Sequence, residues 1–173
     1  MRNIVIGLDP GTGISSPTGF AAFDPDAQVL LHAQEVWTSK QEFSERIKEI
    51  ADQVEELLFA IDPDVNVTVY VESFVMRGKG GEMLARLTGA LMASVPDHCQ
   101  PVATIQNTTV KKIVGGHGRA DKAEVANGVH TYFQADAESR ERVQAYINAK
   151  LFDVLDALAI GIAGHLRATK QAE

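Results

Sequence analysis

The stretch Asn3-Ile-Val-Ile-Gly-Leu-Asp9-Pro-Gly-Thr-Gly13 decides the fold, because it joins a buried strand to an acid. Its aliphatic residues run almost without a break from Ile4 to Leu8, which is typical of a strand covered on both faces. The strand ends at Asp9, and a Pro-Gly turn follows at once. Burying a carboxylate is unfavourable unless it is paired or bound to a metal. We therefore predict that Asp9 anchors a functional site.

The composition is that of one globular domain. The chain has 173 residues, of which 45% are hydrophobic and 23% are charged, and this length predicts a single domain over residues 1–173. No apolar run reaches about 18 residues and no signal peptide is recognised, so we expect no membrane association. The lone Cys99 excludes an internal disulfide and fits the reducing cytoplasm.

The charge is unevenly distributed along the chain. A formal net charge of -7 argues, taken alone, against binding to nucleic acid. Residues 73–122, however, contain seven basic and three acidic side chains, a net charge of +4. The acidic residues are concentrated at 42–56 and 136–141. A basic face on an acidic protein is therefore possible.

The order of expected elements indicates an α/β protein. Strands at residues 19–23 and 29–37 are joined to the first strand by short turns, as in an antiparallel meander. Strands at 65–72 and 101–105 are linked by a helix and are expected to be parallel. Helices are expected at 43–61, 82–95, 108–114, 120–133, about 139–147 and 151–168. The predicted fold class is a mixed five-stranded sheet, three antiparallel strands and then parallel ones, with helices on both faces.

Local signals set the boundaries of these elements. Thr38 or Ser39 is expected to cap the first helix, and Thr108 the helix at 108–114. Asp121 is expected to cap the next helix or to form a local salt bridge. The glycine-rich segment 77–81 is expected to be a flexible basic loop.

Four acids are candidates for a shared site. Glu72, like Asp9, ends a strand, and Asp153 and Asp156 lie on one face of the last helix at its start. Taken alone, the Asp153/Asp156 pair is explained as well by the helix dipole. If the first and fourth strands are neighbours and this helix packs across them, the four acids converge and cannot all ionise without cations. Oxygen ligands favour Mg²⁺ or Mn²⁺, and two such ions suit phosphodiester hydrolysis.

Four blocks of the sequence resemble the RuvC family of Holliday junction resolvases, which has a ribonuclease H-like fold. The blocks are Ile6-Gly-Leu-Asp9-Pro-Gly-Thr-Gly13, Val71-Glu72 with the loop and helix that follow, residues 110–125 with the Ala-Asp-Lys motif, and Asp153-Val-Leu-Asp156-Ala-Leu-Ala-Ile160. The resemblance implies that Asp9, Glu72, Asp153 and Asp156 are catalytic acids that bind the metal. It also implies that Lys111 and Lys122 lie near the scissile phosphate and the junction.

The same resemblance implies the reaction and the partners. The expected activity is that of a crossover junction endodeoxyribonuclease, which nicks four-way branched DNA symmetrically and leaves 5′-phosphate and 3′-hydroxyl ends. The expected cofactor is Mg²⁺ or Mn²⁺, two ions per active site, in a homodimer. The expected location is the cytoplasm of a bacterial or phage-infected cell. The segment 133–153 looks longer than in typical bacterial members, which suggests a phage-encoded one.

Further DNA contacts are expected around these blocks. Phe74 lies two residues after Glu72, whereas many family members carry an aromatic residue three positions after this Glu, and some use it to wedge apart junction base pairs. Core packing explains Phe74 equally well. The other candidates are basic residues near the acids or before the helix at 120–133: Arg77, Lys79, Lys112 and Arg119.

Three alternative functions are weighed against this interpretation. A nuclease similar to YqgF would act on RNA and would lack the basic blocks around Lys111 and Lys122. An actin-like nucleotide binder would use the segment after Asp9 as a phosphate loop, but it needs a much longer chain. A junction-binding protein without catalysis remains an alternative, although all four acids are present.

Overall fold

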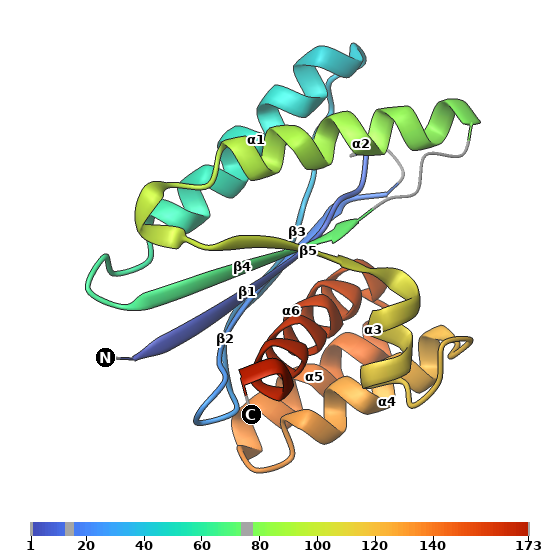
Figure 1. Cartoon of the computed structure of the whole chain (residues 1–173). Coiled ribbons are helices and arrows are strands. Elements are labelled where there is room, and N and C mark those ends of the chain that lie inside the picture. The colour runs from blue at the N-terminus through green and yellow to red at the C-terminus, as the bar shows by residue number, and fades with distance from the viewer. Residues whose placement is uncertain (1, 13–15, 74–77, 173) are drawn as a thin grey trace.

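A five-stranded mixed sheet forms the centre of the molecule, with β1 in its middle (Figure 1). The computed structural model describes residues 2–12, 16–73 and 78–172. The strands lie in the order β3-β2-β1-β4-β5, and β1 pairs antiparallel with β2 and parallel with β4. Their bounds are β1 Asn3–Asp9, β2 Thr18–Asp24, β3 Val29–Val36, β4 Asn66–Ser73 and β5 Val102–Gln106. The predicted fold class is confirmed.

Helices cover both faces of the sheet (Figure 1). On one face lie α1 (Phe43–Phe59) and α2 (Gly78–Ala93). On the other lie α3 (Asn107–Val114), α4 (Lys122–Tyr132), α5 (Ala137–Ala149) and α6 (Phe152–Ala172). A short 3₁₀ helix, η1 (Asp97–Cys99), precedes β5. Although α6 has 21 residues, no helix in the described ranges combines the length and apolar character needed to cross a membrane.

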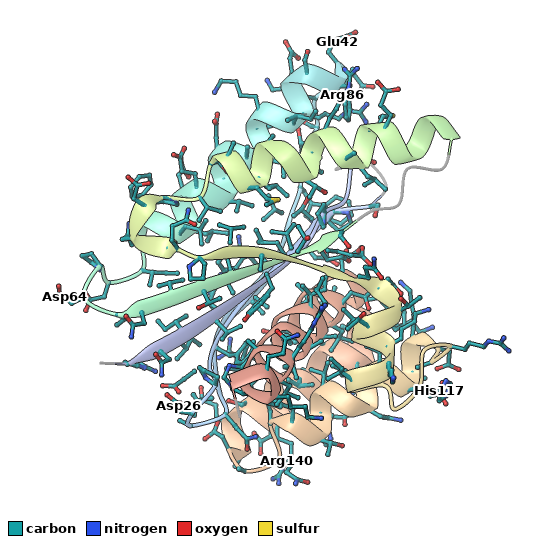
Figure 2. All side chains as sticks on the ribbon, viewed as in Figure 1. Asp26, Glu42, Asp64, Arg86, His117 and Arg140 are labelled. Carbon is teal, nitrogen blue, oxygen red and sulfur yellow. The ribbon has the colours of Figure 1, made fainter. Side chains whose placement is uncertain are left out.

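The alternation of side chains along β1 creates two hydrophobic cores. Ile4, Ile6 and Leu8 point to the core beneath α1 and α2, whereas Val5 points to the core beneath α6. Figure 2 shows side chains filling both layers, while charged residues such as Asp64 and Arg140 project outward. Gly7 and then Asp9 continue this alternation on the α6 side.

Glycines on the sheet allow α6 to lie unusually close to it. A Cβ atom at Gly7 would lie 1.9 Å from the Ala157 carbonyl oxygen, and one at Gly19 would lie 2.0 Å from that of Asp153. No side chain larger than hydrogen fits at these two positions without displacing the helix. The small apolar residues of α6 are buried from Ala157 to Ala163, as the sequence predicts.

One helix cap and one helix start differ from the prediction on the α1/α2 side. Helix α1 begins at Phe43, so neither Thr38 nor Ser39 caps it. The Thr38 hydroxyl instead donates a hydrogen bond to Glu49. Helix α2 begins at Gly78, so residues 78–81, predicted as a loop, are helical. Burial of Leu87 and Leu91 against the core stabilises α2 despite the weak helix propensity of glycine.

On the other face, one predicted helix cap is wrong and one is confirmed. Helix α3 begins at Asn107, so the prediction that Thr108 caps it is wrong. Asp121 does cap α4, because its side chain accepts from the Glu124 N–H while the Glu124 carboxylate accepts from the Asp121 N–H. This capping box fixes the first residue of the helix, Lys122.

Candidate active site

Asp9 and Glu72 come together because β1 and β4 are parallel neighbours. The register pairs Leu8 with Val71, so Asp9 and Glu72 are the next residues along the two strands. Leu8 and Val71 belong to the core under α1 and α2. The alternation of side chains therefore turns both acids toward α6. Glu72 is only 7% exposed.

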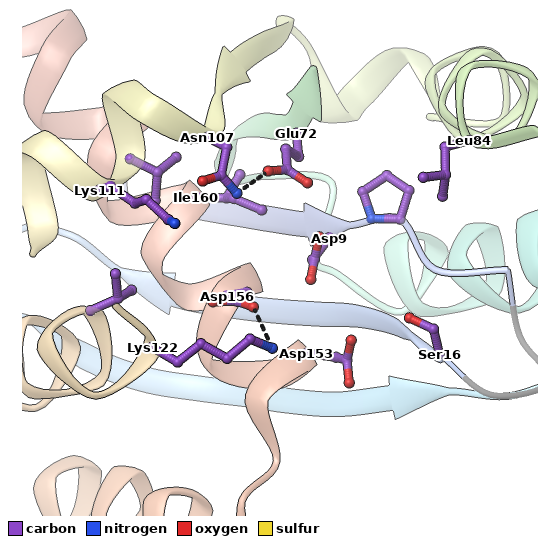
Figure 3. A pocket seen from close by; sticks show the side chains of 13 residues that line it. Asp9, Ser16, Glu72, Leu84, Asn107, Lys111, Lys122, Asp153, Asp156 and Ile160 are labelled. Atoms are coloured by element: carbon purple, nitrogen blue, oxygen red, sulfur yellow. Dashed lines mark hydrogen bonds and ion pairs between the residues drawn. The ribbon is translucent and has the colours of Figure 1, made fainter. Parts of the chain in front are cut away.

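Helix α6 brings two further acids to the same place. Asp153 and Asp156 lie in its first turns, and with Asp9 and Glu72 they line one cavity of about 260 Å³ (Figure 3). In Figure 3, Asp9 lies between Glu72 and the two aspartates of α6. The structure thus brings together all four acids that the sequence singled out.

Two of the acids, Asp9 and Asp156, have raised pKa values. Burial raises the pKa of Asp9 well above its ordinary value, and the charges of Glu72, Asp156 and Asp153 raise it further. Burial also raises the pKa of Asp156 to about 6; the Lys122 charge opposes this shift, and the Glu72 and Asp153 charges add to it. Such a concentration of negative charge favours a bound cation.

Two lysines lie at this cavity, as predicted. Lys122 Nζ is 3.7 Å from Asp156 Oδ2 and lies over the Phe152 ring, 4.9 Å from its centroid. Lys111, on α3, also lines the cavity, and Figure 3 shows it on the same side as Asn107. Positive charge is therefore available beside the acids for a phosphate group.

One residue of the site was missed by the sequence analysis. Asn107 Nδ2 donates a hydrogen bond of 2.5 Å to Glu72 Oε1 (Figure 3). The available signal was its position directly after β5, the strand that pairs with β4. Polar residues that follow neighbouring parallel strands meet at the same edge of the sheet.

Of the remaining predicted DNA contacts, the two with described side chains lie outside the cavity. Lys112 and Arg119 are exposed and do not line it. Phe74 and Arg77 lie outside the described residues. Lys79 falls in the first turn of α2, but its side chain is also outside the described part.

The donor set of the cavity is suited to a hard divalent cation. All four acidic side chains supply oxygen, the ligand that Mg²⁺ and Mn²⁺ prefer. Among the described residues, no group of three His, Cys, Asp or Glu side chains is already gathered closely enough to hold an ion. Asn107 and Lys122 occupy one oxygen each of Glu72 and Asp156. The donor chemistry and the shared charge fit the predicted metal.

The fold and this cavity define the class of ribonuclease H-like proteins, with acids at the ends of the central strands and on the helix behind them. The chain belongs to the RuvC family: the family model described as crossover junction endodeoxyribonuclease RuvC matches residues 5–164. The predicted resemblance is confirmed. This membership does not agree with the actin-like alternative.

Known proteins support the assignment over almost the whole chain. The RuvC of Xanthomonas campestris is 29% identical over 175 residues, which cover 96% of this chain and 90% of the relative. The RuvC of Shewanella woodyi is 26% identical over 162 residues, which cover 92% of this chain and 84% of the relative. The RuvC structure of Thermus thermophilus matches with a TM-score of 0.69 and 26% identity. The match covers 97% of this chain and 96% of that structure. The same protein in complex with a Holliday junction substrate matches with a TM-score of 0.71 at 24% identity, a likeness in fold.

Proposed function

We propose that the chain is a metal-dependent, structure-selective DNA endonuclease that resolves Holliday junctions. It nicks paired strands symmetrically and leaves 5′-phosphate and 3′-hydroxyl ends. The observation that carries this proposal is the single cavity in which acids from β1, β4 and α6 lie beside two lysines, in a member of the RuvC family.

Each residue of the cavity has a role in this proposal. Asp9, Glu72, Asp153 and Asp156 would hold two Mg²⁺ or Mn²⁺ ions, and these ions would supply water activation and charge stabilisation for hydrolysis of a phosphodiester. Asp9 would be the central ligand, because it lies between Glu72 and the two aspartates of α6 (Figure 3). Lys111 and Lys122 attract the phosphate to a site that would otherwise repel it.

Paired nicking requires two such sites. The described residues form one cavity that contains the four acids, so we infer that a second copy of the chain supplies the other site in a homodimer. Each copy acts as one nuclease domain over residues 1–173, in the cytoplasm where the DNA is found. Phe74, Arg77, Lys79, Lys112 and Arg119 are proposed to contact the arms of the junction around the cavity.

The test is cleavage of a synthetic four-way junction with Mg²⁺ or Mn²⁺, compared with the same reaction in EDTA. We expect symmetric nicks only with metal. Asp9→Asn and Asp156→Asn should lose cleavage yet keep junction binding, because the basic residues remain. Lys122→Ala should weaken binding or cleavage and lower the salt dependence. Asp52→Asn, an exposed acid of α1, is the control and should cut normally.

The same substrates separate the alternatives. Absence of metal-dependent cutting of any branched DNA would contradict the proposal. Preferential cutting of RNA would favour the nuclease similar to YqgF, and tight junction binding without cutting would favour a non-catalytic protein. Normal cutting by Asp9→Asn would show that the acids are wrongly assigned.

A further inference from the structure

Glu72 is held by a neutral side chain from a different element. Strand β5 pairs with β4 so that Glu72 lies beside Ile105 and Ser73 beside Gln106. The next residue, Asn107, begins α3 and extends its amide to Glu72 Oε1 at 2.5 Å.

We propose that Asn107 is a positioning residue that orients the Glu72 carboxylate for metal binding. This inference rests on the proposed function of the cavity. A carboxylate can only accept hydrogen bonds, so the amide nitrogen of Asn107 must face it. The bond to Oε1 restricts the rotation of the carboxylate, and Asn107 does not occupy the other oxygen, Oε2. Partners behind the ligands of a metal commonly set ligand orientation in this way.

Asn107 is uncharged, whereas Lys122, the partner of Asp156, is positively charged. Lys122 places a positive charge 3.7 Å from Asp156 Oδ2, and this charge compensates the carboxylate and competes with a cation. Asn107 orients Glu72 without compensating its charge. Glu72 is also buried, so water competes little for its hydrogen bond with Asn107. The amide therefore selects a conformation while the full negative charge stays available to the metal.

The competing explanation is that Asn107 only joins α3 to β4. A structural role of this kind would affect the melting temperature and every activity together. A positioning role would change metal affinity and leave the fold and the metal-free binding of DNA unchanged. The two explanations therefore differ in measurable quantities.

The experiment compares Asn107→Ala and the nearly isosteric Asn107→Leu with the wild type. Mn²⁺ binding to the protein without DNA is followed by the electron paramagnetic resonance signal of free Mn²⁺. We expect the Mn²⁺ dissociation constant to rise about 10-fold in both variants. The Mg²⁺ concentration for half-maximal cleavage should rise in parallel. Junction affinity in EDTA should stay within about twofold, because no phosphate contact is removed.

Two further variants serve as rescue and control. Asn107→Gln keeps the amide on a longer stem and should recover part of the Mn²⁺ affinity. Thr108→Ala changes the exposed neighbour in the same turn of α3 and should bind Mn²⁺ like the wild type. Thermal melting of all variants shows whether the fold is intact.

Wild-type Mn²⁺ binding by both Asn107→Ala and Asn107→Leu would overturn the inference, as would an equal loss in Thr108→Ala. A fall in melting temperature without a change in Mn²⁺ affinity would assign Asn107 a structural role alone. If the wild-type chain cuts no branched DNA but loses Mn²⁺ affinity on Asn107→Ala, the proposed function fails and the positioning role stands.

Discussion

Replacing Gly7 by alanine tests how the fold positions the acids. Gly7 lies on β1, two residues before Asp9, and faces α6. An alanine Cβ would lie 1.9 Å from the Ala157 carbonyl oxygen and 2.8 Å from the Gly161 nitrogen. Both neighbours are backbone atoms of a buried helix, so no side-chain rotation can relieve the clash.

The size of the effect follows from these distances. Cβ atoms essentially never approach another atom within 3.0 Å, so α6 would have to move away from β1 by at least about 1.1 Å. Overpacking a core costs about 1–3 kcal/mol even where side chains adjust, so we expect a loss of about 3 kcal/mol or more in unfolding free energy. Asp156 directly precedes Ala157 and would move with it. A misplacement of about 1 Å can lower a catalytic rate about 100-fold.

The assay combines urea unfolding with cleavage of a four-way junction. Gly89→Ala is the matched control, because a Cβ there meets nothing within 4 Å on the exposed side of α2. It should stabilise the helix by up to about 1 kcal/mol and leave cleavage unchanged. If Gly7→Ala does not fold, Gly161→Ala should show a smaller effect, since its closest contact is the Phe23 ring at 2.8 Å. Wild-type stability and cleavage in Gly7→Ala would refute this account of α6.

Two predictions concern stability away from the cavity. The Leu30 N–H donates a hydrogen bond of 2.8 Å to the buried Ser139 hydroxyl. Ser139→Ala should therefore lower the unfolding free energy measured in urea by about 1–3 kcal/mol. An equal loss in the exposed control Ser44→Ala would contradict this prediction. Burial raises the pKa of Asp24, but hydrogen bonds from the Ala27 N–H, the Arg2 guanidinium and the Asp26 N–H lower it overall. The ionised carboxylate therefore stabilises the fold above the unfolded pKa of about 4. The stability difference between the wild type and Asp24→Asn should shrink as the pH falls through the folded pKa, and a difference independent of pH would show that the Asp24 charge does not contribute.

The sheet could be predicted from the sequence because its strands carry strong local signals. The run from Ile4 to Leu8 and the run before Glu72 are β-branched and apolar, and they are the two central strands. The predicted start of α2 was wrong, and the reason is physical. Gly78, Gly80 and Gly81 have low helix propensity, and the packing of Leu87 and Leu91 against the core was not visible in the local sequence.

The acids of the cavity were predictable for a similar reason, since each stands at an element boundary with a recognisable pattern. Asn107 was not, because its role depends on the register of β4 with β5 rather than on any property of residues near it in sequence. The contact of Lys122 with the Phe152 ring likewise requires α4 and α6 to pack side by side. Pairings between distant segments are determined by tertiary structure, and one sequence contains no direct record of them.

The distribution of charge in the fold explains how a chain of net charge -7 is suited to DNA. Many of the acidic side chains lie on α1, and Figure 2 labels Glu42 at the outer end of that helix. The sheet separates α1 from α3 and α4, which carry the cavity lysines Lys111 and Lys122 (Figure 1). Because exposed charges more than about 8 Å apart are largely screened at physiological salt, the acids of α1 repel DNA at the cavity weakly. In the proposed function, the acids within the cavity would repel DNA directly, and bound cations together with Lys111 and Lys122 would offset this repulsion.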